Sequence, residues 1–151
     1  MANSYDLEQT SNMKRLTEQE YKEEMLRVLV KLDEVCRKNN LKYFINAGTF
    51  LGAVRHQGYI PWDDDIDVFV EIKDMKRLSE ILKDDEEFQF VCMFDESDYF
   101  STNALMYSNK YVAKLVKFPA ECEIGVNIDV FPLFGVPDNM EEIKKFMGMF
   151  R

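Results

Sequence analysis

Four aspartates stand in one short stretch of the chain: Asp63, Asp64, Asp65 and Asp67. In a β-strand, side chains at i and i+2 share a face, with Cα atoms ~6.5–7 Å apart. Asp65 and Asp67 therefore pair, and Asp63 joins them if the chain is already extended there. Adjacent carboxylates repel unless a cation lies between them, and Mg²⁺ commonly takes one or two carboxylates plus substrate phosphate. The spacing predicts a phosphate-linked metal site; the alternative is a turn with solvated acids.

Residues on either side of the acids fit phosphate chemistry. Gly48 and Thr49 end a predicted strand and open a helix, where free backbone amides and a hydroxyl hold a phosphate oxygen well. Arg55, in the connection to the acids, is a candidate bidentate phosphate clamp. A third carboxylate comes from Asp129, which is costly to bury in its apolar stretch unless it is paired with a cation or donors. A phosphate-binding turn, a helix and a strand with paired acids form the layout of the nucleotidyltransferase fold.

Two segments resemble the LicD family, which includes bacterial phosphocholine transferases and is similar to fukutin and fukutin-related protein. The first runs from Asn46 to Val68, NAGTFLGAVRHQGYIPWDDDIDV, and the second is IDVFPL at 128–133. With the preceding helix, the resemblance covers most of residues 20–135.

The resemblance implies a nucleotidyltransferase-type core and a metal-dependent transfer. In this reaction a phospho-alcohol group passes from a CDP-activated donor such as CDP-choline to a hydroxyl of a glycan or teichoic-acid precursor, with release of CMP. Phosphocholine is the leading candidate for the group transferred. It also implies Mg²⁺ (or Mn²⁺) on Asp65 and Asp67. By the same resemblance, Asp63 lies close to the metal, and Asp129 either completes the metal site as the third acid or acts as the base. The donor diphosphate is held by Gly48, Thr49 and Arg55.

The elements that position these residues alternate between helix and strand, which predicts an α/β (α+β) class with a mixed β-sheet flanked by helices. A capping box at Thr17 opens a helix of about 20 residues that ends near Asn40. A short helix is expected at 49–55. The other expected helices are 74–82 and 140–150; the expected strands are 43–45, 66–70, 88–93 and 125–131, with a hairpin formed by 104–107 and 111–116.

Composition narrows the class of protein. The chain has 151 residues and a formal net charge of −9, without a basic stripe for nucleic acid. The sequence shows neither a signal segment nor an apolar run long enough for a membrane span, so a cytoplasmic protein is expected. A lipid-linked acceptor is compatible with peripheral membrane contact. Cys36, Cys92 and Cys122 are expected to be reduced and buried.

Residues 1–16 are expected to form a flexible arm and 17–151 a single domain. A final helix without a cap suggests a fragment, truncated at its C-terminus, of something longer. Trp62 is expected to pack beneath the acidic loop.

Two other functions stay open. One is a nucleotidyltransferase that adds NMP to a small molecule, and the other is a non-catalytic truncated relative that only binds nucleotide.

Overall fold

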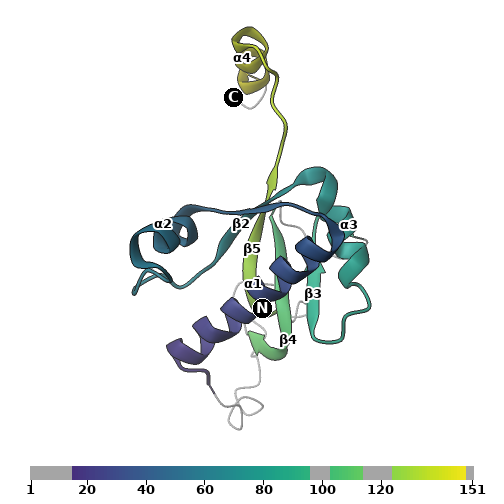
Figure 1. Ribbon diagram of the computed structural model, residues 1–151. Helices are drawn as coiled ribbons and strands as arrows, with labels where there is room; N and C mark the ends of the chain where they lie inside the picture. Colours follow the sequence, from purple (N-terminus) through teal and green to yellow (C-terminus); the bar gives the residue numbers. More distant parts are fainter. Residues whose placement is uncertain (1–14, 96–102, 114–123, 149–151) are drawn as a thin grey trace, which may run out of the picture.

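The computed structural model describes residues 15–95, 103–113 and 124–148. Helices and strands alternate as far as the third strand, two more strands follow before the last helix, and the five strands form one mixed sheet in the order β1-β2-β5-β4-β3 (Figure 1). The predicted α+β class is confirmed. The elements are α1 Glu18–Asn39, β1 Tyr43–Ile45, α2 Ala47–His56, β2 Asp67–Glu71, α3 Ile72–Leu82, β3 Phe88–Val91, β4 Ala104–Ala113, β5 Ile124–Leu133 and α4 Met140–Gly148.

Helix α1 begins and ends at the residues that the sequence predicts. The Thr17 amide donates to Glu20 Oε2 at 2.8 Å and the Glu20 amide donates to Thr17 Oγ1 at 3.2 Å, which confirms the capping box. Asn40 closes the helix in the left-handed conformation, with φ 53°. The side chains at helical spacing that face the sheet are fully or almost fully buried: Met25, Val28, Leu32, Val35 and Cys36.

One face of the sheet carries the hydrophobic core. Val68 and Val70 of β2 and Ile128 and Val130 of β5 have no exposed surface, and they pack in one cluster with residues of α1 and α3. The residues between them on both strands are only partly buried, because alternate side chains of a strand point to opposite faces. The acids and several aromatic residues lie on this second face.

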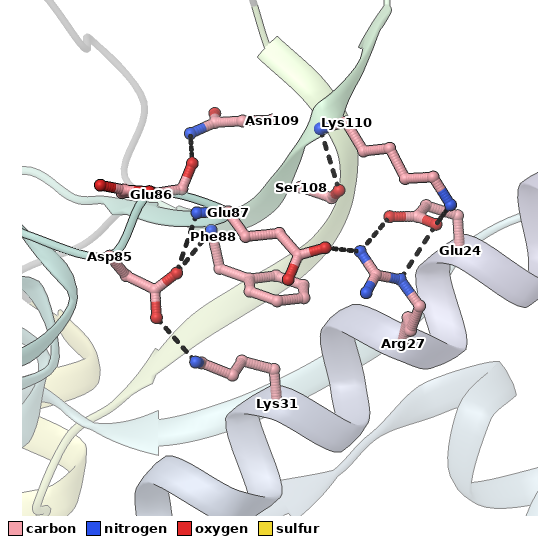
Figure 2. Close-up of polar contacts among 10 residues, drawn as sticks. All are labelled: Glu24, Arg27, Lys31, Asp85, Glu86, Glu87, Phe88, Ser108, Asn109 and Lys110. Atoms are coloured by element: carbon pink, nitrogen blue, oxygen red, sulfur yellow. Dashed lines mark hydrogen bonds and ion pairs between the residues drawn. The ribbon is translucent and has the colours of Figure 1, made fainter.

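The hairpin predicted through Ser108, Asn109 and Lys110 is wrong. β4 continues through these residues and pairs with β5 on both sides of an irregularity between Ser108 and Ala113. The residues that suggested a turn are bonded to the segment before β3: the Asn109 backbone amide donates to the Glu87 carbonyl at 2.8 Å, and its side-chain amide donates to the Glu86 carbonyl (Figure 2). Gly125 allows β4 and β5 to approach closely at this irregularity, because a Cβ at this position would lie 1.8 Å from the Ser108 carbonyl oxygen. Residues 114–116 lie outside the described part.

Charged side chains connect α1 to the segment that leads into β3. Arg27 donates to both carboxylate oxygens of Glu24, at 3.1 and 3.0 Å, and to Glu87 at 2.7 Å (Figure 2). Lys31 and Asp85 form a second ion pair at 2.6 Å. Glu24 is only 3% exposed, so its charge depends on these partners.

The prediction that Cys36 and Cys92 are buried is confirmed, and Cys122 lies outside the described residues. Helix α4 stands away from the sheet at the end of an extended segment, and none of its residues is buried (Figure 1). Within the described ranges, we find no helix with the length and apolar character of a membrane span. The predicted division into a flexible arm and one domain stays a prediction.

Candidate functional site

Parallel pairing of β2 and β5 brings Asp67 and Asp129 together. The two residues are register partners, and the Asp129 amide donates to the Ile66 carbonyl at 2.9 Å where the ladder begins. Neighbouring strands lie about 4.8 Å apart, and partner side chains point to the same face. Two carboxylates from segments far apart in the sequence thus stand side by side.

The other three acids lie in a turn that precedes β2. The strand begins at Asp67, not at Ile66, and the Asp63 amide donates to the Ile60 carbonyl at 3.0 Å, so residues 63–65 are not an extended continuation of the strand. The expected i, i+2 alignment of Asp63 with Asp65 and Asp67 stays a prediction. Carboxylate oxygens of Asp63, Asp64 and Asp65 instead lie within 4.8 Å of one another. Asp64 was missed from the sequence because its parity places it on the opposite face of an extended chain.

Burial and mutual repulsion disturb these carboxyl groups. Desolvation, followed by the charges of Asp65, Asp129 and Asp63, raises the pKa of Asp67 to about 6. Desolvation raises the pKa of Asp129 too, and the charge of Asp65 adds to it. The pKa of Asp65 is raised by desolvation and by Asp63 and Asp64. Asp65 acts electrostatically on both strand acids, so the turn and the strand pair form one acidic site.

The start of helix α2 adjoins this acidic site. The Thr49 hydroxyl accepts the Asp67 amide at 2.9 Å, and a hydroxyl that accepts one bond can still donate another. A Cβ at Gly48 would lie 2.3 Å from Asp63 Oδ2, so only glycine lets the carboxylate approach the first turn. The N-cap residue Asn46 makes no side-chain cap bond. This helix end has amide donors of the kind that anions bind.

Arg55 lies at the other end of α2, about 10 Å along the axis from Gly48. Its exposed side chain contacts the His56 ring, with Nε 3.3 Å from Nδ1. The structure does not bring Arg55 to the first turn of the helix. Trp62 does not pack beneath the loop as predicted: it is 77% exposed, with its ring edge-on to His56.

A pocket of about 410 Å³ lies between α1, α2 and the loop that precedes β2. Gly48, Thr49 and Asp63 form its polar wall. The remaining wall is mainly apolar and includes Leu26, Leu29, Ile45, Ala53, Tyr59, Ile60 and Ile66. Asp63 is thus the acid that connects the acidic site to this pocket.

Comparison with known proteins gives one family. The family of LicD, fukutin and fukutin-related protein, described as a nucleotidyltransferase domain, matches residues 40–149. The chain is 38% identical over 69 residues to the lipopolysaccharide cholinephosphotransferase LicD of Haemophilus influenzae, covering 46% of this chain and 26% of that protein. It is 44% identical over 64 residues to an uncharacterised protein of Rickettsia prowazekii, covering 42% of this chain and 24% of that protein. An uncharacterised protein of Rickettsia typhi is 53% identical over 49 residues, 32% of this chain and 16% of that protein. These matches span about a quarter or less of each curated relative.

Proposed function

The chain belongs to the LicD family, and on this premise we propose that it serves a metal-dependent phospho-alcohol transfer. Phosphocholine is the group we propose is moved, and its donor is CDP-activated. The acceptor is a hydroxyl of a cell-surface glycan precursor, and the second product is CMP. The cholinephosphotransferase of Haemophilus influenzae supports the choice of alcohol. A cytoplasmic location, with the acceptor presented on a lipid carrier, belongs to the same proposal.

The observation that carries the proposal is the pairing of Asp67 with Asp129 on one sheet face, next to Asp65. Without a cation this arrangement is unfavourable, because desolvation and like charges raise the pKa of all three carboxyl groups. Hard oxygen donors in this number suit Mg²⁺ or Mn²⁺. The residues present thus fit a divalent metal ion.

Asp65, Asp67 and Asp129 would hold the metal ion, with Asp63 close by. The ion would supply neutralisation of charge on the donor diphosphate. The amides at the start of α2 and the Thr49 hydroxyl would bind phosphate oxygens, which fixes the donor against the acids. In the alternative role for Asp129, its carboxylate takes the proton of the acceptor hydroxyl, a step that a raised pKa favours.

Ligand-dependent stabilisation tests the proposal. Mg²⁺ or Mn²⁺ together with CDP-choline, CDP-ethanolamine, CDP-ribitol or CTP should raise the melting temperature. A ligand at 100 times its Kd adds about 2.7 kcal/mol, which corresponds to roughly 5–10 °C for a chain of this size. Asp65→Ala should abolish the rise without loss of the fold. A full rise in that variant would contradict the site assignment.

Gly48→Ala tests the approach of Asp63 to helix α2 with a single methyl group. The new Cβ would lie 2.3 Å from Asp63 Oδ2, so the carboxylate must move away. We expect the nucleotide-dependent rise to fall by at least half. Gly58→Ala is the matched control, because nothing lies within 4 Å of a Cβ there. Equal responses of the two variants would count against a role for this approach.

Nucleotidyl transfer to a small molecule is the second candidate, and the family's description as a nucleotidyltransferase domain favours it. Product analysis separates the two reactions: phospho-alcohol transfer releases CMP, whereas nucleotidyl transfer from CTP releases pyrophosphate. Binding of cytidine nucleotides without either product would identify a non-catalytic binding module.

A further inference from the structure

Three phenylalanines form a row across the face of the sheet that lies opposite the core beneath α1 and α3. Phe44 of β1 is the register partner of Phe69 of β2, and Phe69 is the partner of Phe131 of β5. The Phe69 and Phe131 rings meet edge to face, with centroids 6.2 Å apart. We refer to these three residues as the phenylalanine row.

The phenylalanine row lies outside the hydrophobic core. The core beneath α1 and α3 uses the opposite face of the same strands, through residues such as Val68 and Val130. Phe44 is 50% exposed, and Phe69 and Phe131 are half-buried. The rings thus present apolar surface that packing against α1 and α3 does not use.

The acid pair stands in the next row on the same face. Asp67 precedes Phe69 by two residues, and Asp129 precedes Phe131 by two. Two residues of strand span about 6.6 Å. A ligand that reaches the acids with one group would therefore touch the rings with a group a few bonds away.

We propose that the phenylalanine row is the subsite for a quaternary ammonium group, and hence for the choline end of the donor. This inference rests on the proposed function, because the acids must hold the diphosphate end. A trimethylammonium group has an apolar methyl shell and a diffuse positive charge, which aromatic faces attract. The phenylalanine row offers such a group an aromatic surface bordered by the carboxylates of Asp67 and Asp129.

Charge near the row favours a cation. Asp67 and Asp129 border the row on one side, with Asp65 close to both. One divalent ion cancels only two of these negative charges, and a bound diphosphate adds more. On the other side, Glu71 is already paired with Lys73. The acids are thus the part of this face that attracts the choline nitrogen.

The same surface disfavours other phospho-alcohols. The hydroxyls of ribitol would lose water against phenyl rings that offer no strong hydrogen-bond partner. The primary ammonium of ethanolamine is strongly hydrated and loses more on contact with the rings than a trimethylammonium group does. We therefore expect the order CDP-choline, then CDP-ethanolamine, then CDP-ribitol.

Isothermal titration calorimetry in the presence of Mg²⁺ tests this order by measuring the affinities for the three CDP-alcohols and for CMP. The proteins compared are wild type, Phe44→Leu, Phe69→Leu and Phe131→Leu. Leucine keeps most of the apolar volume but removes the ring face. We expect the ratio of CDP-choline to CDP-ethanolamine affinity to fall about fivefold, with the affinity for CMP unchanged. Phe131→Tyr should restore the ratio. Phe50→Leu, an exposed phenylalanine of α2, is the matched control.

An unchanged ratio in all three row variants would overturn the proposal, as would equal losses for CDP-choline and CMP. A wild type that binds no cytidine nucleotide would instead refute the proposed function. The row is then tested with tetramethylammonium chloride by NMR. Shifts of the row's ring signals, and not of Phe50, would support the subsite, and their absence would overturn it.

Discussion

Replacing Asp67 by asparagine should stabilise the metal-free protein at neutral pH. In the folded chain, desolvation and neighbouring acids raise the pKa of this carboxyl group to about 6 from its ordinary value of 3.8. The folded state therefore holds the proton more tightly than the unfolded state does. Between these two pKa values the free energy of unfolding falls as pH rises, and above pH 6 the loss is complete. Asparagine resembles the protonated acid and does not suffer this loss.

The magnitude follows from the size of the shift. A displacement from 3.8 to about 6 corresponds to ~3 kcal/mol at 1.36 kcal/mol per pH unit. The side chain is only partly buried, so solvent screening reduces this to about 1–2 kcal/mol. For a chain of this length, a gain of about 1–2 kcal/mol raises the melting temperature by roughly 2–8 °C.

Urea denaturation at pH 7.5 and at pH 4, with EDTA present, measures the effect. The Asp67→Asn variant should be more stable than wild type at pH 7.5 and nearly equal to it at pH 4. Mg²⁺ with CDP-choline should then reverse the order at pH 7.5, because wild type gains stability and the variant does not. Asp84→Asn, an exposed acid after α3, is the control. A variant that is less stable than wild type at pH 7.5, or equally stabilised at both pH values, would refute the reasoning.

Two further substitutions test a buried ion pair of α1 and the close contact between β4 and β5. Glu24→Ala removes a carboxylate that is 3% exposed and bound by the Arg27 guanidinium. We expect the free energy of unfolding, measured by urea denaturation, to fall by about 2 kcal/mol, against less than about 0.5 kcal/mol for Glu34→Ala at an exposed position. Equal losses would mean that the buried ion pair contributes nothing. Gly125→Ala places a Cβ 1.8 Å from the backbone oxygen of Ser108, so we expect a loss of about 3 kcal/mol or an unfolded chain by circular dichroism, whereas Gly58→Ala should be neutral. A stable Gly125→Ala variant would show that the backbones of β4 and β5 can move apart at this position.

Local signals in the sequence were sufficient for most elements. The capping box and helical period of α1 depend on residues three and four apart, so the sequence predicts both ends of this helix correctly. The apolar stretches of β2 and β5 predict their strands for the same reason. The hairpin prediction failed because Ser108 pairs with both β3 and β5 and Asn109 bonds to the segment before β3, which no local pattern reveals.

The sequence alone determined the family resemblance, the choice of acids and the prediction that Gly48 and Thr49 bind phosphate, since each depends on residue type and short spacing. Tertiary structure decided where those groups meet. Asp67 and Asp129 are 62 residues apart and become neighbours only through the parallel register of two strands. The same register aligns Phe69 with Phe131, and β1 adds Phe44. Strand register depends on which hydrophobic faces pack beneath α1 and α3, and this is a property of the whole core rather than of any one segment.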